Sequence, residues 1–304
     1  MGITDVLTTT REFVDLLPVL LIKPQPKDTV DSMGLRLEQN AESYGDKPMI
    51  TFEGQDQTWG EFNALTNRLA HVLKDQGVKK GDCISLLMEN RIEQLAVIFA
   101  GVKLGAQVGL INTNLRGRPL IHCITVTESS KCIVGEELAD AVEDVLPELT
   151  LKQGEDFLFV ADKGEKDAPT WAMNLAAPMG KASEENPAET HSVTLGDTAL
   201  YIFTSGTTGL PKAAVLSHNR FLSSAFSAWK TGLKCSQKDR IYLCLPLYHG
   251  TGLLIGMGSS LMSGASMFIR RKFSGSRFLD EVREQKTNCF IYIGELCRYL
   301  MHQP

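Results

Sequence analysis

The stretch Tyr201-Ile-Phe-Thr-Ser-Gly-Thr-Thr-Gly-Leu-Pro-Lys-Ala213 decides how the rest of this 304-residue chain is interpreted. An apolar run, predicted as a strand, leads into hydroxyl residues that alternate with glycines, and Lys212 follows. Glycines let backbone N–H groups converge in conformations that a Cβ disfavours, and convergent N–H groups form a concave anion site. Hydroxyls add donors, and Lys212 adds a compact positive charge. The stretch therefore predicts a polyphosphate-binding loop, whose hydroxyl oxygens also suit Mg²⁺.

This loop differs from other motifs that bind phosphate or carry a nucleophile. The pattern G-x-x-x-x-G-K-[ST] cannot be aligned on residues 204–212, which disfavours a P-loop NTPase and a G-x-G-x-x-G dinucleotide fold. The chain has no G-x-S-x-G element, so an α/β-hydrolase is unsupported. A polar, glycine-rich turn between two strands is the remaining alternative. The ordered run of hydroxyls and glycines favours a binding loop over that turn.

Upstream of the loop, short apolar segments alternate with helical patterns. The predicted elements are a strand at 83–88, a helix at 91–104, a strand at 107–111, a helix at 119–127 and a strand at 131–134. Before them, Thr58 and Glu61 form a capping box that opens a helix, and Gly77 is placed to end it. This order is typical of a largely parallel sheet covered by helices, with its ligand crevice at the carboxyl ends of the strands.

Downstream of the loop, a second series of elements follows. We predict strands at 199–203, 213–216, 241–245, 265–269 and 289–293, and helices at 219–229, 276–285 and from 296 to 301. We divide the chain into an N-terminal segment (1–28), a first α/β lobe (29–195) with a surface excursion (154–194), and a second α/β lobe (196–304) that opens with the phosphate loop. The predicted fold is α/β, with two lobes that each hold a largely parallel or mixed sheet flanked by helices.

Composition narrows the classes of protein. Apolar residues make up 43% of the chain, which excludes a disordered segment, and the net charge of −5 gives no basic footprint for nucleic acid. The seven cysteines form no C-x-x-C pair, which is typical of a reducing cytoplasm. The apolar run at 13–22 is too short to span a membrane. Residues 1–28 are either a helix docked on the protein or an interfacial segment at the inner face of a membrane.

Residues 204–212, Thr-Ser-Gly-Thr-Thr-Gly-Leu-Pro-Lys, resemble the phosphate loop of the AMP-forming adenylating enzymes. This superfamily contains acyl-CoA synthetases, peptide synthetases and luciferases. The resemblance extends over the chain from about Thr29 and includes the segments 58–63, 86–114 and Leu245-Pro-Leu-Tyr-His249. It implies the N-terminal region of an adenylating-enzyme fold.

One branch of the superfamily is the most similar. Family members usually carry Gly after the loop lysine, whereas Ala213 and Ala214 stand here. The fatty acid transport proteins and very-long-chain acyl-CoA synthetases share that departure, and residues 271–278 and 292–300 also resemble this branch. The resemblance implies a fatty acid–CoA ligase that uses ATP, Mg²⁺ and coenzyme A and acts through an acyl-adenylate.

The resemblance also assigns expected roles to individual residues. Thr204 is the expected Mg²⁺ ligand, and the expected nucleotide- and phosphate-binding residues are Thr204, Ser205, Gly206, Thr207, Thr208, Gly209 and Lys212. His249, Tyr292 and Gly294 are expected at the acyl and adenylate pocket. A hydrogen-bonded structural role for His249 and core packing for Tyr292 and Gly294 are the alternatives.

Further family motifs are expected beyond residue 300. The family supplies there a Glu that completes the Mg²⁺ site and a C-terminal domain with a catalytic Lys, and neither motif follows Lys212 in this sequence. We therefore expect the chain to be a fragment with little or no ligase activity by itself. Two other functions remain open. One is a CoA ligase for a carnitine-type, aryl or bile acid, and the other is a non-catalytic nucleotide- or acyl-binding module that aids lipid uptake.

Overall fold

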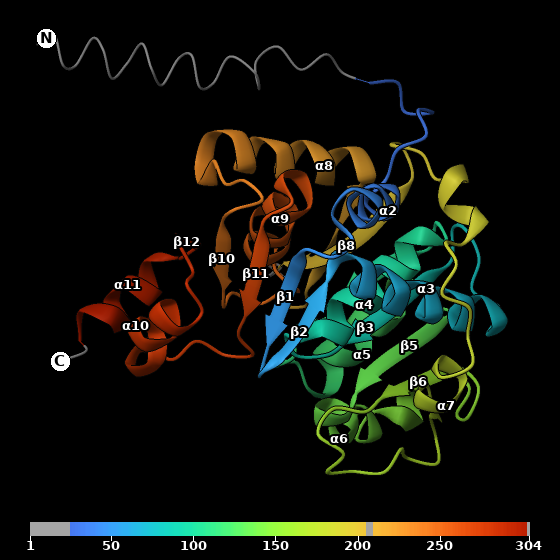
Figure 1. Ribbon diagram of the computed structural model, residues 1–304. Helices are drawn as coiled ribbons and strands as arrows, with labels where there is room; N and C mark the ends of the chain where they lie inside the picture. The colour runs from blue at the N-terminus through green and yellow to red at the C-terminus, as the bar shows by residue number, and fades with distance from the viewer. Residues whose placement is uncertain (1–24, 205–208, 303–304) are drawn as a thin grey trace, which may run out of the picture.

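Two β-sheets and the helices around them make up residues 25–204 and 209–302, which are the residues that this computed structural model describes (Figure 1). The larger sheet has seven strands in the order β7 (Met173–Asn174), β6 (Phe157–Val160), β5 (Lys131–Gly135), β3 (Cys83–Leu87), β4 (Gln107–Leu110), β8 (Thr198–Thr204) and β9 (Lys212–Ser217). All neighbours in it are parallel except β8 and β9, which are antiparallel.

The smaller sheet has five strands. Their order is β12 (Cys289–Phe290), β10 (Arg240–Leu243), β11 (Ser266–Ile269), β1 (Pro48–Phe52) and β2 (Gln55–Thr58). All neighbours are parallel except β1 and β2, which form an antiparallel pair. Two largely parallel sheets with one antiparallel pair each, flanked by helices, confirm the predicted α/β fold class.

Helices fill the space between the sheets and cover their outer faces. A mutually packed group consists of α2 (Met33–Tyr44), α3 (Trp59–Asp75), α4 (Ile92–Lys103), α8 (His218–Ser227) and α9 (Gly258–Ser263), and its buried residues form one core with both sheets. A second core joins the seven-stranded sheet to α5 (Gly117–Thr125) and α6 (Ala139–Glu143). Figure 1 shows α10 (Gly275–Glu284) and α11 (Gly294–Met301) beside β10 and β12.

The remaining helical segments are short. They are α7 (Ala176–Met179), the 3₁₀ turns η1 (Glu136–Leu138), η2 (Leu146–Glu148) and η3 (Ala188–Ser192), and the π-helical segments η4 (Ala228–Leu233) and η5 (Thr251–Met257). In η5, a Cβ on Gly252 would lie 2.5 Å from the carbonyl oxygen of Pro246. Close backbone packing therefore requires glycine at this position.

The predicted helices and strands are confirmed to within a few residues at their ends, and the elements that the sequence does not predict are α2, α6, α7, α9, β1, β2, β6 and β7. The predicted surface excursion over 154–194 contains β6, a strand that is buried along its whole length. The sheets also take strands from both sides of residues 195 and 196, because β8 and β9 complete the larger sheet while β1 and β2 complete the smaller one. The division of the chain into two lobes at residues 195 and 196 stays a prediction, and each sheet contains strands from both sides of that boundary.

The capping box that the sequence predicts is present at the start of α3. The hydroxyl of Thr58 accepts a hydrogen bond from the N–H of Glu61 at 3.1 Å, and the Glu61 carboxylate accepts one from the N–H of Thr58 at 2.8 Å. Two N–H groups that a helix start leaves unpaired are thus satisfied. The chain leaves α3 through Gly77, whose φ of +86° favours glycine.

The buried charge of Lys103 links the segment that precedes β8 to helices α2, α3 and α4. Lys103 at the end of α4 is fully buried, and its Nζ lies 3.1 Å from Oε1 of Glu38 on α2. The same Nζ donates to the side-chain oxygens of Asn63 and Asn67 on α3 and of Asn186. Burial lowers the pKa of Lys103 to about 8, and the Glu38 carboxylate opposes that shift.

The N-terminal segment predicted at 1–28 lies mostly outside the described residues, so neither the docked helix nor the interfacial segment can be compared with the structure. Within residues 25–204 and 209–302, every helix falls short of the length and apolar character that a membrane span needs.

Replacing Lys103 by Met tests the buried cluster. Lys103→Met keeps most of the side-chain volume but leaves the Glu38 carboxylate and the amide oxygens of Asn63 and Asn67 without the Lys103 donor, so we expect a loss of about 3 kcal/mol in the free energy of unfolding. The measurement is urea unfolding at neutral pH. Adding Glu38→Gln to the variant removes the orphaned charge and should restore part of that loss. A single variant as stable as the wild type would contradict this account.

Candidate functional site

The predicted phosphate loop connects two paired strands of the larger sheet. β8 and β9 are antiparallel, and Thr204 pairs with Lys212 across the loop. The hydroxyl of Thr204 also donates to the carbonyl of Lys212 at 3.5 Å. Four predicted binding residues, Ser205, Gly206, Thr207 and Thr208, lie outside the described residues. The described part of the loop therefore consists of its two limbs, which leave the sheet side by side.

A cavity of about 510 Å³ lies against these two limbs. Its lining residues are Asn112, Leu115, Pro119, Phe203, Thr204, Gly209, Pro211 and His249. The structure thus places Thr204 and Gly209 of the loop and His249 around one cavity. Lys212 is exposed at the start of β9.

The loop limbs suit a phosphate group better than a metal held by protein alone. Gly209 has a φ of +87°, and a Cβ built on it would meet no atom within 4 Å, so a ligand can approach its backbone. Across residues 25–204 and 209–302, no group of three or more His, Cys, Asp and Glu side chains could hold a metal ion. Mg²⁺ that arrives on nucleotide phosphates needs only one or two protein oxygens, and the Thr204 hydroxyl fits that requirement.

His249 reaches the cavity from the turn that follows β10. The turn is closed by a hydrogen bond from the N–H of His249 to the carbonyl of Pro246 at 3.1 Å. The imidazole packs against the ring of Tyr248, with centroids 4.6 Å apart. Burial lowers the pKa of His249, so the ring is largely neutral near pH 7. A neutral ring at the edge of a cavity suits contact with an acyl group or a nucleotide.

Asn90 holds the His249 turn in place from the other sheet. It follows β3, and its amide donates to the carbonyl of Leu245 at 2.9 Å and to that of Arg270 at 3.2 Å. Its side-chain oxygen accepts a hydrogen bond from the N–H of Leu247 at 2.8 Å. The Asn90 side chain is buried, so its polar groups depend on these partners. The carboxyl end of β3 is thereby joined to those of β10 and β11.

Charged side chains also link the carboxyl ends of strands in the two sheets. Arg271 follows β11, and its guanidinium pairs with Asp162, which follows β6, and with Glu53, which follows β1. The buried Arg91 lies 3.3 Å from the same Asp162 carboxylate. These four residues come from the carboxyl ends of strands in both sheets. These parallel strands of the two sheets therefore end at a common junction, to which Asn90 joins the His249 turn.

Tyr292 and Gly294 are not among the residues that line the 510 Å³ cavity. Tyr292 is 56% exposed, and its ring stacks on Phe290 with centroids 5.8 Å apart. Gly294 begins α11 and is exposed. Their neighbour Ile293 lines a second cavity, of about 280 Å³, which also contacts Pro246 and Tyr248 in the His249 turn. The expected pocket role of Tyr292 and Gly294 stays a prediction.

The sequence does not predict five of the residues that line the cavity: Asn112, Leu115, Pro119, Phe203 and Pro211. A signal existed for Asn112, because it follows β4, and the carboxyl end of a parallel strand is where ligands bind. Leu115 precedes α5 and Pro119 lies in its first turn, and local sequence does not show which strand end that helix faces. Phe203 and Pro211 flank the loop, and local sequence predicts only strand and turn roles for them.

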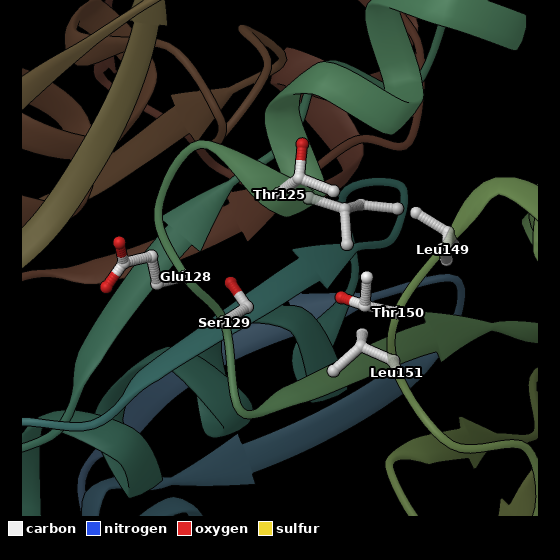
Figure 2. Close-up of a pocket in the computed structure, with 7 residues that line it drawn as sticks. Thr125, Glu128, Ser129, Leu149, Thr150 and Leu151 are labelled. Carbon is white, nitrogen blue, oxygen red and sulfur yellow. The ribbon is translucent and has the colours of Figure 1, made fainter.

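Another hollow, of about 290 Å³, lies away from all predicted site residues (Figure 2). It sits between the end of α5 and the segment that precedes β6, and Figure 2 shows the Glu128 carboxylate turned away from Leu149, Thr150 and Leu151. The Ser129 hydroxyl in its wall already contacts the hydroxyls of Ser85 and Thr127. Because Ser129 is engaged and the carboxylate points outward, this hollow lacks the convergent polar groups of a ligand site.

Comparison with known proteins adds independent findings. A family model described as AMP-binding enzyme matches residues 37–304. The chain is 40% identical over 262 residues to long-chain fatty acid transport protein 6 of Mus musculus, covering 85% of this chain and 41% of that protein. It is 37% identical over 285 residues to the medium/long-chain-fatty-acid–CoA ligase FadD6 of Mycobacterium tuberculosis, covering 94% and 45%. The chain thus spans less than half the length of these relatives.

A solved structure supports the fold. The inhibitor-bound N-terminal domain of FACL13 from Mycobacterium tuberculosis superposes with a TM-score of 0.75 at 25% identity, over 90% of this chain and 65% of that one.

The junction is tested by replacing Asn90. Asn90→Ala leaves two carbonyl groups and one N–H without their partner in a buried place, so we expect a loss of about 2–3 kcal/mol in the free energy of unfolding. Asn174→Ala is the matched control, because Asn174 is exposed and caps only its own turn through the N–H of Ala176. Equal losses in the two variants, measured by urea unfolding, would contradict the role of Asn90.

Proposed function

The chain belongs to the AMP-binding enzyme family, and from this premise we propose that it is the nucleotide- and acid-binding part of an ATP-dependent fatty acid–CoA ligase. The observation that carries the proposal is the cavity that Thr204, Gly209 and His249 line together. The fatty acid substrate is proposed because the relatives named above are a fatty acid transport protein and a fatty-acid–CoA ligase.

The proposed reaction has two steps. In the first, a carboxylate oxygen of the acid attacks the α-phosphorus of ATP, the bond from that phosphorus to the bridging oxygen breaks, and pyrophosphate leaves. In the second, the thiol of coenzyme A attacks the acyl carbon, loses its proton, and AMP leaves with the electron pair of the broken C–O bond. Phosphoryl chemistry of this kind depends on positioning and on neutralising charge, which a loop rich in donors supplies.

The residues of this chain divide between the two substrates in the proposal. Thr204, Ser205, Gly206, Thr207, Thr208, Gly209 and Lys212 bind the nucleotide phosphates. Mg²⁺ bound to ATP would neutralise phosphate charge, with the Thr204 hydroxyl as its protein ligand. His249, as a largely neutral ring, borders the acyl group and the adenylate, and Tyr292 and Gly294 are proposed as further contacts for the acid.

Two alternative functions keep the same fold. A carnitine-type, aryl or bile acid would use the same nucleotide site and differ only in the acid. A non-catalytic module that binds nucleotide or acyl groups and aids lipid uptake would bind ligand without releasing AMP. Cytoplasmic location, with contact between residues 1–28 and the inner face of a membrane, is part of the proposal.

Nucleotide binding is tested with Lys212. Lys212→Met removes the charge that we assign to the phosphates, so MgATP should bind about tenfold more weakly, the equivalent of one charge-assisted contact. Isothermal titration of the 304-residue chain with MgATP measures the affinity. Lys152→Met is the control, since Lys152 is an exposed lysine that pairs with Glu155 and does not line the cavity. An unchanged affinity in Lys212→Met would contradict the assignment.

The acid and the activity are tested by ATP–pyrophosphate exchange. We expect exchange to depend on long-chain fatty acids in a complete ligase and to be weak in the 304-residue chain alone, because the family's catalytic Lys and second Mg²⁺ ligand are not found after Lys212. A panel of fatty, aryl, bile and carnitine-type acids separates the two ligase functions. Turnover by this chain comparable with a complete ligase would refute the second expectation, and nucleotide binding without AMP release would favour the non-catalytic module.

A further inference from the structure

A histidine on α5 contacts the backbone of the loop limb that leads to Lys212. The Nε2 atom of His122 lies 2.9 Å from the carbonyl oxygen of Pro211. A carbonyl oxygen can only accept, so Nε2 carries the proton and donates. The bond spans 89 positions in the sequence and is partly buried. His122 has no place in the phosphate loop itself.

The helix that carries His122 is anchored independently of the loop. One face of α5, with Leu120, Cys123 and Ile124, is buried in the core beneath the larger sheet. The side that carries Pro119 instead lines the 510 Å³ cavity together with Pro211. His122 follows Pro119 by three positions, so the two lie on neighbouring turns of one helix face. A rigid helix therefore supports the loop limb from outside.

The hydrogen bond is made at Pro211, where ψ is the backbone torsion angle that the proline ring does not fix. The ring of Pro211 restricts its φ, and proline has no N–H that could anchor it. A hydrogen bond on its carbonyl sets the peptide plane that joins Pro211 to Lys212. On the far side of that plane, Lys212 pairs with Thr204 and enters β9. The direction in which Lys212 leaves the strand end thus depends on both the strand pairing and the His122 contact.

We propose that His122 is a positioning residue of the nucleotide site, which holds the Gly209–Lys212 limb in the geometry that binds phosphate by donating a hydrogen bond to the Pro211 carbonyl. The inference rests on the proposed function, because it assumes that Lys212 and Gly209 meet a nucleotide. It adds a residue outside the loop, on a different element, to the set that determines nucleotide affinity.

The test uses His122→Phe, which removes the donor and retains a ring, and His122→Gln, whose amide can still donate. We expect His122→Phe to bind MgATP about fivefold more weakly by isothermal titration, the loss of one neutral hydrogen bond, and His122→Gln to stay within about twofold of the wild type. In the absence of nucleotide, hydrogen–deuterium exchange of a peptide that contains Lys212 and Ala213 should be faster in His122→Phe and unchanged in His122→Gln.

His71→Phe is the matched control. His71 also bonds a backbone carbonyl, that of Glu185 at 2.9 Å, but on the segment that runs beside α3. His71→Phe should leave both MgATP affinity and exchange at Lys212 unchanged. Equal weakening in His122→Phe and His71→Phe, or no rescue by glutamine, would overturn the inference. If the wild type binds no MgATP the proposed function fails and the inference with it, whereas normal nucleotide binding and exchange in His122→Phe overturn the inference alone.

Discussion

The three hydrogen bonds of the Asn90 side chain are the interaction on which the arrangement of the site depends. They join the end of β3 in one sheet to the ends of β10 and β11 in the other. Because strands that run in parallel place their carboxyl ends together, the join brings two separate sets of loops to one junction. The turn that carries His249 is held there directly, and the phosphate loop approaches from β8 in the larger sheet.

Buried charges give this arrangement its rigidity. Arg271 and Arg91 share the Asp162 carboxylate at the junction, and Lys103 gathers a carboxylate and three amides in the helical layer. A charge removed from water is tolerated only where partners surround it, so each cluster favours one relative placement of the elements that supply them. One of the elements held by Lys103 is the segment around Asn186, which leads into β8 and the loop.

Most elements of the fold could be predicted from local sequence because their signals are local. The capping box of Thr58 and Glu61 needs only one helical turn, and the strands of the larger sheet are short apolar runs between helical patterns. The strand at Phe157–Val160 was missed because polar, aperiodic sequence follows it and a four-residue apolar run has no period to detect. Local sequence also does not predict that β8 and β9 belong to the larger sheet, because the sequence of a strand does not show which strand it pairs with.

The sequence alone predicts a phosphate-binding loop at 204–212, because glycines, hydroxyls and a lysine lie within nine consecutive positions and this combination of residue types favours an anion site. Only the tertiary structure decided what faces that loop. Asn112 and His122 approach it from separate elements, and Asn90 contacts Leu245 across 155 positions of chain. Contacts of that range depend on how two sheets pack against a shared layer of helices, which is a property of the folded core as a whole and of no single segment.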